Sequence, residues 1–560
     1  MRLFNRKTPQ RQFKDTQTET LLKKTIEFFE EKGLKNIKKD DLEGVWYSDF
    51  LKFVAENQVF YHFLGIPLDE KDQGRFDMWR ISEMNETLGF YGLCYWYCWQ
   101  VSILGLGPIW MSQNQQIQKK AKSLLKEGGI FAYGLSEKDH GADIYSTEMT
   151  LHLEANGGYK ANGRKYYIGN GNCAAMVSVF GKIAETNEYV FFVVDTQHKN
   201  YKCVKKIETS GVRQAFVSEF ELSDYPISEN EILSRGKEAF STALNTVNVG
   251  KFQLGFAAIG IASHAMEEAV KHASHRVLYG KAVTNFAHVK NLFIESYCRL
   301  VAAKLYGQRA CDYMRHASLE DRRYLLFNSI MKMKVTSEAE KIVGQLHEVI
   351  AAKGFEQDTY FEMALRDIPM LPKLEGTVHV NMALINKFMK NYFFSDHSYK
   401  QVPIADEPVH DHYLFSQNSQ SMGEQKFPSY STAYKDITGD NVKIFKEQLD
   451  TYRELLKHAG PDSKQIKNVD FMLSLGELFS LGVYSQLILE NTKLLKTDVE
   501  IVKGIYKFLI KDFSHFALHI TLNFELSNLQ EKYLQEMIKK PIFDNSDNEV
   551  WENHIAKIGD

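Results

Sequence analysis

The sequence is poor in proline and cysteine, and this limits both its fold and its chemistry. Only 11 prolines and six cysteines occur among 560 residues. The low proline content favours long helices, because proline disrupts the interior of a helix. Cys94 and Cys98 form a C-x-x-x-C within an apolar run, and the sequence has no C-x-x-C pair. We therefore interpret the cysteines as buried thiols of a reducing compartment and predict neither a metal site nor a disulfide framework.

Charge excess and targeting signals are also scarce. A net charge of −3 gives no sign of a surface for nucleic acid. The basic segment 1–14 lacks the apolar core of a secretory signal. The uncharged run 89–110 approaches the length of a membrane span, but its glycines, Gln100 and Pro108 favour a buried core helix with its closing loop. These features predict a soluble protein of the cytoplasm, with an organellar matrix as second choice.

The patterns along the chain predict a mainly α protein with a central β domain. A length of 560 residues exceeds what one hydrophobic core organises, so several domains are expected. We predict an N-terminal helical domain (1–129), a β-barrel domain (130–236), a four-helix bundle with a catalytic loop (237–395), a linker (396–440) and an additional helical domain (441–560).

The β domain is predicted from short segments that are separated by turn residues such as Asn162-Gly163. No helix lies between them and no G-x-G-x-x-G follows one, which argues against a βαβ nucleotide-binding fold. A small barrel or sandwich remains. The β-prone segments are 130–135, 147–154, 159–161, 165–168, 175–182, 189–195 and 216–222.

The segments that follow the β domain are mostly helical. Apolar residues at alternating three and four spacing predict a bundle helix through 249–277, and further bundle helices over 286–314, 324–352 and from about 377. In the linker, we interpret His410-Asp411-His412 as part of a solvated loop rather than a metal site. The middle helices of the last block, 469–495 and 499–529, are apolar on more than one face. They must pack on the main body, on a partner or on a bilayer surface.

The segment 365–379 is the candidate site of catalysis. Its two prolines predict an ordered loop or a broken helix end. Glu375 stands near its end, followed by Gly376, whose permissive backbone lets a carboxylate lie against a ligand. Burial can raise the pKa of a carboxylate until it acts as a base near neutral pH. An isolated E-G-T is more often a solvated acid or a helix cap, so the rest of the sequence decides the interpretation.

Four further stretches point to one family. F-A-Y-G-L-S-E-K-D-H-G-A-D-I at 131–144 resembles the motif Y-x-x-T-E-x-x-x-G-S-D of the acyl-CoA dehydrogenases, and N-G-R-K-Y-Y-I-G-N-G at 162–171 resembles their N-G-x-K-x-W-I-T-N-G. R-V-L-Y-G-K at 276–281 is similar to R-x-x-F-G-K, and A-L-R-D followed by L-E-G-T at 364–377 completes the order. The resemblance covers residues 16–390. The last block resembles the C-terminal extension of the very-long-chain members in its layout.

The resemblance implies an FAD enzyme with the acyl-CoA dehydrogenase fold plus an extra C-terminal helical domain. It implies an acyl-CoA or other acyl thioester as substrate, an electron-transfer flavoprotein as acceptor, and a homodimer or homotetramer. Glu375 matches the loop base of the short- and medium-chain members, which removes the α-proton while the β-hydrogen leaves as hydride. The alternative base position, on the first bundle helix, holds Gly250 here. Small residues around 89–107 suggest room for a medium to long acyl chain.

The resemblance also implies a set of binding residues, several of which depart from the family pattern. Gly169 stands where a threonine hydroxyl usually bonds flavin N5. Lys251 replaces an arginine and Asn248 its nearby acid, while Leu278 replaces a threonine that binds pyrophosphate. The implied cofactor-binding residues are Tyr133, Leu135, Ser136, Tyr167, Gly169, Arg276, Tyr279, Glu348, Ala352, Thr377 and His379. The implied substrate-binding residues are Ala142, Lys251, Leu374 and Gly376.

These departures leave two alternatives open. One is a flavin oxidase or monooxygenase of the same fold, which the missing hydroxyl at Gly169 would suit. The other is an interaction module with little catalysis, which uses the last block for assembly or for peripheral membrane contact. Glu348, Ala351 and Ala352 stand in place of the family's Q-x-x-G-G and favour this alternative, because an acid there repels phosphate. The retained Glu375 argues against it.

Overall fold

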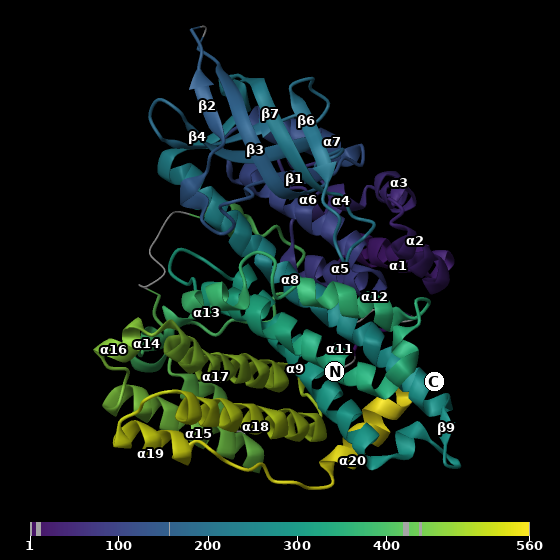
Figure 1. Cartoon of the computed structure of the whole chain (residues 1–560), viewed down its shortest axis with the longest axis vertical. Helices are drawn as coiled ribbons and strands as arrows, with labels where there is room; N and C mark the ends of the chain where they lie inside the picture. The colour runs from purple at the N-terminus through teal and green to yellow at the C-terminus, as the bar shows by residue number, and fades with distance from the viewer. Residues whose placement is uncertain (1–2, 7–12, 156, 418–424, 436–438, 559–560) are drawn as a thin grey trace. The chain divides into compact units, whose positions relative to one another are not determined.

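The computed structural model describes residues 3–6, 13–155, 157–417, 425–435 and 439–558. They form two compact units. The first unit contains residues 6–253 and 406–417, and the second contains residues 3–5, 254–405, 425–435 and 439–558. Figure 1 labels the elements of both units. The finer domain boundaries at 129, 236, 395 and 440 stay predictions.

The helices of the first unit begin and end at residues that the sequence marks. Asp15 caps α1 by accepting a hydrogen bond of 2.8 Å from the Thr18 amide, and Gly33, at φ 73°, follows its last residue. The helices are α1 (Thr16–Lys32), α2 (Leu34–Glu43), α3 (Ser48–Glu56), α4 (Val59–Leu64), α5 (Met78–Tyr91), α6 (Leu93–Met111) and α7 (Gln115–Lys126).

Helix α6 lies in the core of the first unit. Every residue from Leu93 to Trp110 is buried, so a core helix fills most of the uncharged run as predicted. The predicted closing loop is wrong, because the helix continues through Pro108 to Met111. Its glycines allow close packing, because a Cβ at Gly105 would lie 2.7 Å from the backbone of Ala132, and one at Gly107 would lie 2.7 Å from Thr246. The small residues that suggested room for a long acyl chain are therefore packed against their neighbours, and that expectation loses its basis.

The first unit also contains an eight-stranded sheet (Figure 1). Its order is β6-β7-β3-β2-β4-β5-β8, and β1 pairs with β4 in parallel. The segments predicted as two strands, 159–161 and 165–168, are one bulged strand, and β6 and β8 were not predicted. The strands are β1 (Phe131–Gly134), β2 (Thr150–Leu153), β3 (Tyr159–Gly169), β4 (Met176–Ile183), β5 (Tyr189–Val194), β6 (Tyr201–Lys206), β7 (Val217–Ile227) and β8 (Ile232–Arg235).

Part of the predicted linker packs on the first unit. The buried Asp411 carboxylate accepts a hydrogen bond of 2.6 Å from the amide of Met78 at the start of α5, and the His410 ring lies 3.1 Å from the Phe76 carbonyl. Burial lowers the pKa of His410 to about 4. The prediction of a solvated loop is therefore wrong for His410 and Asp411, which anchor the linker to a helix N-terminus.

The second unit contains the predicted bundle. Helix α8 (Gly236–His275) is 40 residues long, and its residues from Leu254 onward belong to this unit. A hairpin of β9 (Val277–Leu278) and β10 (Lys281–Ala282) follows it. The elements that follow, as far as α14, are η3 (Val283–Asn285), α9 (Ala287–Arg315), α10 (Tyr324–Ile330), the π-helical turn η4 (Met331–Val335), α11 (Thr336–Ile350), η5 (Ala351–Phe355), α12 (Tyr360–Asp367), η6 (Ile368–Met370), α13 (Val378–Asn386) and α14 (Met389–Phe394).

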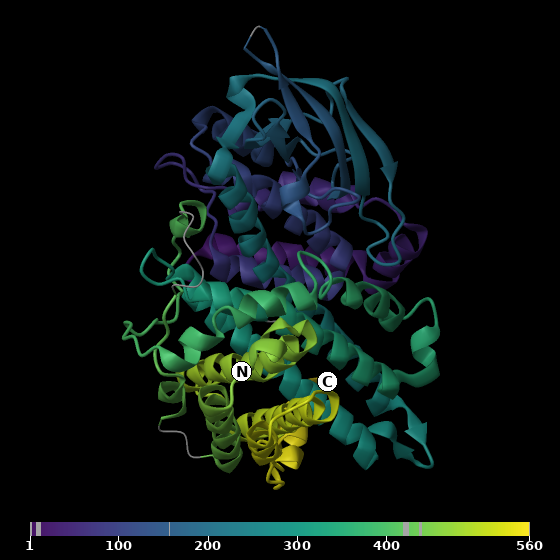
Figure 2. The ribbon, with the colours of Figure 1, turned by 60° about the vertical axis from the view of Figure 1, so that its left-hand side comes forward.

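The last block packs on the bundle within the second unit. Helix α17 contacts α9 and α13, and α18 contacts α9. The yellow-green and yellow helices lie against the green ones in Figure 1 and Figure 2. The sequence left three surfaces open for this block: the main body, a partner or a bilayer. In the structure, the block packs on the main body. Its helices are α15 (Asp440–His458), α16 (Ser463–Lys467), α17 (Val469–Leu495), α18 (Val499–Asn523), α19 (Asn528–Glu536) and α20 (Ser546–Val550).

Helix α17 is also the one helix of the described residues that is long and apolar enough to cross a membrane. However, 78% of its most apolar window is buried within the structure. Its apolar faces therefore belong to a packed core, which removes the reason for assigning this helix to a bilayer.

Buried ion pairs join the last block to the bundle. Arg299 of α9 makes two hydrogen bonds of 2.8 Å to Asp512 of α18, and Arg309 makes one of 2.9 Å to Glu490 of α17. Both arginines are buried. A buried charge is tolerated when it is paired and hydrogen-bonded, so these contacts fix the block in one place.

Candidate active site

The predicted site residues fall in both units, and each unit holds its own set. In the first unit, Tyr133 lies in β1, and Leu135 and Ser136 lie in the turn that follows it. The buried Tyr133 hydroxyl donates to the Ala243 carbonyl at 3.3 Å. The Ser136 carbonyl accepts from the Tyr166 amide at 2.9 Å. The first contact ties β1 to α8, and the second holds the turn on strand β3.

The buried Lys165 also holds the turn that follows β1. Lys165 donates from Nζ to the Leu135 carbonyl at 3.0 Å and to Glu137 Oε1 at 2.7 Å. Burial lowers the pKa of Lys165 to about 8, against the opposing effect of the Glu137 carboxylate. Burial opposes ionisation of Glu137, but Lys165, Thr147 and the Glu148 amide together lower the pKa of this carboxyl below its ordinary value. The pair is a structural anchor that we did not predict, although Lys165 lies within the N-G-R-K motif.

The two predicted flavin-facing residues of β3 lie at a bulge in the strand. A register shift between Lys165 and Ile168 accompanies a left-handed backbone at Tyr167, φ 62°, and the Tyr167 side chain is 63% exposed. Its aromatic face is open to a planar ligand. Gly169 is buried, and a Cβ there would lie 2.7 Å from both Tyr97 and Val101 of α6. The packing of α6 therefore leaves no space at this position for the threonine of the family pattern.

In the second unit, Glu375 lies in a short loop between η6 and α13. Glu375 has φ 53° and Gly376 has φ 90°, so two consecutive residues adopt the left-handed conformation. Thr377 caps α13 by accepting from the Val380 amide at 3.4 Å. The segment is the predicted ordered loop, and Glu375 and Leu374 are half-buried in it.

Two buried side chains hold this loop from the bundle side. Lys332 of η4 donates from Nζ to the Pro372 carbonyl at 2.5 Å and to the Gly376 carbonyl. The buried Asn381 donates from Nδ2 to the Gly376 carbonyl at 3.0 Å and to the Thr377 carbonyl at 3.1 Å. Neither side chain was predicted. No sequence signal marks Lys332, because M-K-M-K looks like an exposed alternation.

The other predicted residues of the second unit are exposed. Arg276 follows the end of α8, and Tyr279, at φ 51°, is 95% exposed in the β9–β10 hairpin. Ala351 follows the last residue of α11 at φ 57° and ψ −144°, a conformation that glycine usually supplies. The exposed side chains at these places include Glu348, Ala352, Thr377 and His379.

The predicted substrate-binding residues lie in different surroundings. Ala142 is exposed in a loop, and its carbonyl accepts from the Ile144 amide at 3.1 Å. Lys251 and Asn248 are buried on α8. Leu374 and Gly376 flank Glu375. Within each unit, the structure therefore brings together the β1 turn with β3, and Leu374, Glu375, Gly376 and Thr377 with one another.

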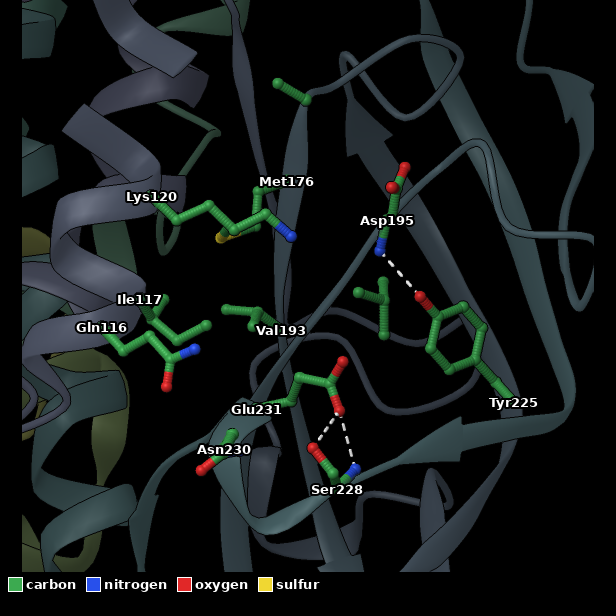
Figure 3. Close-up of a pocket in the computed structure, with 12 residues that line it drawn as sticks. Gln116, Ile117, Lys120, Met176, Val193, Asp195, Tyr225, Ser228, Asn230 and Glu231 are labelled. Carbon is green, nitrogen blue, oxygen red and sulfur yellow. Dashed lines mark hydrogen bonds between the residues drawn. The ribbon is translucent and has the colours of Figure 1, made fainter. Parts of the chain in front are cut away.

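The first unit also has a cavity of about 310 Å³ between α7 and the sheet (Figure 3). It contains none of the predicted site residues. Its rim groups bond one another, since Glu231 accepts from the Ser228 amide and hydroxyl at 2.7 and 2.8 Å, and the Asp195 amide donates to the Tyr225 hydroxyl at 2.9 Å. We therefore assign these hydrogen-bonded rim groups a role in stabilising the local fold.

Comparison with known proteins decides the family. Residues 132–225 match the acyl-CoA dehydrogenase middle domain, and residues 239–390 match the acyl-CoA dehydrogenase C-terminal domain. The chain carries the middle and C-terminal domains of the acyl-CoA dehydrogenase family. This confirms the predicted family and the predicted oxidoreductase class. The acyl-CoA dehydrogenase family is FAD-dependent, so the predicted cofactor is also confirmed.

Curated relatives are 23–24% identical to the chain over the residues that align. A 3-(aryl)acrylate reductase of Clostridium sporogenes is 24% identical over 378 residues, which cover 66% of this chain and 98% of the relative. The caffeyl-CoA reductase-Etf complex subunit CarC of Acetobacterium woodii is 23% identical over 372 residues, covering 65% and 96%. A short-chain specific acyl-CoA dehydrogenase of Megasphaera elsdenii is 23% identical over 280 residues, covering 49% and 72%.

Solved structures confirm the predicted fold class. An acyl-CoA dehydrogenase complexed with FAD from Bacillus anthracis aligns with a TM-score of 0.78 at 16% identity, over 97% of this chain and 95% of that one. The butyryl-CoA dehydrogenase of Megasphaera elsdenii aligns with a TM-score of 0.61 at 20% identity, over 66% and 97%. The first alignment includes the last helical block. The specific resemblance of the last helical block to the very-long-chain members stays a prediction.

The residues of the chain fit FAD in three respects. The Tyr167 ring is open to stack on a planar ring system, and Arg276 presents an exposed guanidinium of the kind that binds phosphate. Ala351 keeps a backbone conformation suited to glycine, at the position where the family has glycine. Glu348, an exposed acid, is the one predicted contact that does not favour phosphate.

Proposed function

We propose that this protein catalyses FAD-dependent α,β-dehydrogenation of an acyl thioester, from acyl-CoA to the trans-2-enoyl-CoA. The observation that carries the proposal is the loop of Glu375, in a chain of the acyl-CoA dehydrogenase family. Glu375 stands in the family's E-G-T position, and buried side chains hold the carbonyls on both sides of it.

Glu375 is the proposed base. Its carboxylate removes the proton from the carbon next to the thioester carbonyl. Negative charge then develops on the carbonyl oxygen, where we propose that the Glu375 backbone N–H donates a hydrogen bond. FAD, when bound, would supply the acceptor, N5, for the β-hydrogen, which leaves as a hydride. The electron pair of the α C–H bond becomes the new double bond, so atoms and electrons balance.

We propose the following cofactor and substrate contacts from the family pattern. Tyr133, Leu135, Ser136 and Tyr167 would lie along the flavin. Arg276 would bind the pyrophosphate of a neighbouring subunit through its guanidinium fork. Tyr279, Ala352, Thr377 and His379 would hold the adenylate side. Ala142, Lys251, Leu374 and Gly376 would contact the substrate.

The proposal also covers the electron acceptor, the oligomeric state and the location of the protein. The relative from Acetobacterium woodii is named as a subunit of a reductase-Etf complex, which supports an electron-transfer flavoprotein as partner here. We also propose a homodimer or homotetramer and a location in the cytoplasm. The exposed hairpin at Tyr279 supports an assembly in which it meets another subunit.

The reverse reaction is a second candidate, because two of the relatives are named as reductases of unsaturated acids or thioesters. The same residues would serve, with Glu375 returning the α-proton. An oxidase acting on a carrier-bound acyl group is a third. It is supported by the 23% identity and TM-score of 0.59 to a prolyl acyl carrier protein oxidase.

The test is the visible spectrum of the purified protein under anaerobic conditions. Bleaching of the flavin band by one of butyryl-, octanoyl- or palmitoyl-CoA supports the dehydrogenase. Recovery of the band when crotonyl- or cinnamoyl-CoA is added to the dithionite-reduced protein supports the reductase. A flavin that reacts with none of these thioesters in either direction would contradict the proposal. Reoxidation within seconds in air would favour the oxidase.

A further inference from the structure

A π-helical turn places two lysines inside the bundle. The turn η4 interrupts the long helix between α10 and α11, and both Lys332 and Lys334 are buried there. A buried ammonium group is expensive unless it is fully hydrogen-bonded or paired. π-Helical turns within α-helices occur frequently at functional sites. The groups that the two lysines contact therefore indicate the function of the turn.

The two lysines contact different groups. Lys334 lies 2.6 Å from Glu338, which also accepts from Arg299 at 2.8 Å, so it belongs to the ion-pair network that joins the last block. Lys332 instead reaches the backbone of the loop, at the Pro372 and Gly376 carbonyls. These carbonyls lie three residues before and one residue after Glu375.

The loop conformation depends on these contacts. Glu375 adopts a left-handed backbone that is unfavourable for a residue with a Cβ. Hydrogen bonds from an ammonium group are about twice as strong as neutral ones. Lys332 and Asn381 both donate hydrogen bonds to the Gly376 carbonyl, which fixes the peptide plane between Gly376 and Thr377, directly after the left-handed pair Glu375 and Gly376. Without them, the loop can relax and move both the carboxylate and the backbone N–H of Glu375.

We infer that Lys332 is a positioning residue for the catalytic loop, holding Glu375 in the orientation that removes the α-proton. This inference rests on the proposed function for its kinetic consequences. The anchoring of the loop by Lys332 does not depend on the proposed function.

The experiment compares Lys332→Met with Lys334→Met in the full-length holoprotein. Both changes remove a buried ammonium from the same turn, but only the first removes contacts to the loop. The first measurement is amide hydrogen exchange of the peptide that covers residues 371–377. The second is the rate of flavin bleaching as a function of acyl-CoA concentration. The third is the long-wavelength absorbance with a 3-thia-acyl-CoA, which reports an α-carbanion beside the oxidised flavin. Lys332→Arg, which keeps a cationic donor, tests for rescue.

We expect Lys332→Met to exchange the 371–377 amides about tenfold faster. We expect its limiting bleaching rate to fall about 100-fold, with the thioester concentration for half-maximal rate nearly unchanged, and its 3-thia-acyl-CoA band to be lost. Lys334→Met should keep the rate, the band and the loop exchange of the original protein. Lys332→Arg should recover at least part of the rate.

Equal effects of the two lysine variants would overturn the inference, as would unchanged loop exchange in a folded Lys332→Met protein. If Lys332→Met does not fold, the same comparison is made with Asn381→Leu, which removes the second donor to Gly376. If no thioester bleaches the original protein, the proposed function fails. Loop exchange that rises only in the Lys332 variant still supports the anchor, and exchange that does not rise contradicts it.

Discussion

Gly169 is a glycine because its neighbours leave no room for a side chain. The position that its Cβ would take lies 2.7 Å from Tyr97 and Val101, and 2.9 Å from the Tyr97 hydroxyl. Tyr97 is buried, so it cannot swing into solvent. The missing threonine hydroxyl is therefore a consequence of how α6 packs on β3 in this chain.

Gly169→Ala should lower the free energy of unfolding by about 1–3 kcal/mol, because the added methyl overpacks a filled site. Gly344→Ala on α11 is the matched control. Its Cβ would meet nothing within 4 Å, and alanine favours a helix by about 1 kcal/mol over glycine. Urea unfolding of both variants measures the difference. A Gly169→Ala protein as stable as the original would show that α6 can move, and the Gly169→Ala/Val101→Ala double variant should recover part of the loss.

At the scale of elements, the buried network of Arg299, Lys334 and Glu338 couples α9, α11 and η4. Arg299 lies 2.8 Å from both Glu338 and Asp512. Burial opposes ionisation of Glu338, but Lys334 and Arg299 lower the pKa of its carboxyl to about 2. The folded-state pKa is thus below the unfolded one. The carboxylate stabilises the fold fully above the unfolded pKa, and this contribution disappears as the pH falls toward 2.

Glu338→Gln should cost about 3–5 kcal/mol at pH 7, because it leaves two buried cations short of a counter-charge. The difference from the original protein should shrink between about pH 4.5 and pH 2. Urea titrations at pH 7, 5 and 3 check both statements. Glu454→Gln, at a half-exposed surface pair with Arg453, should change stability by less than about 1 kcal/mol. A Glu338→Gln cost that is the same at pH 3 and pH 7 would contradict the assignment.

Which elements could be predicted from the sequence depended on how regular their patterns are. Helix α17 begins and ends where its apolar pattern does, and the turn residues Asn170-Gly171 lie between β3 and β4. Strand β3 was divided in two because Asn162-Gly163 is typical of a turn, whereas these residues lie within the strand at a register shift between Ala161 and Gly163. Strand β6 was missed because its lysines, Lys202, Lys205 and Lys206, mask the strand pattern. The turn η4 and its Lys332 contact could not be predicted, because a π turn shifts which residues face inward and the partner is backbone.

At the scale of the whole molecule, the last helical block completes the bundle's core. Its helices cover α9 and α13 and supply the counter-charges of Arg299 and Arg309. A chain that ends at residue 439 would leave those arginines without Asp512 and Glu490, beside newly exposed apolar faces. We expect it to aggregate or to lack a cooperative thermal transition. A truncated protein that is monodisperse and melts cooperatively would instead make the block a separable module.

The central claim is that Glu375 is the base of a thioester dehydrogenation, and the rate of anaerobic flavin bleaching tests it most directly. The rate is measured in a stopped-flow instrument with the acyl-CoA that reacts fastest, for the original protein, Glu375→Gln and Glu356→Gln. Glu356 is an exposed acid paired with Lys353, and its variant controls for loss of a charge near the bundle. We predict a loss of at least about 1,000-fold for Glu375→Gln, with the flavin still bound, and no change for Glu356→Gln. A Glu375→Gln protein that bleaches at the original rate would contradict the account.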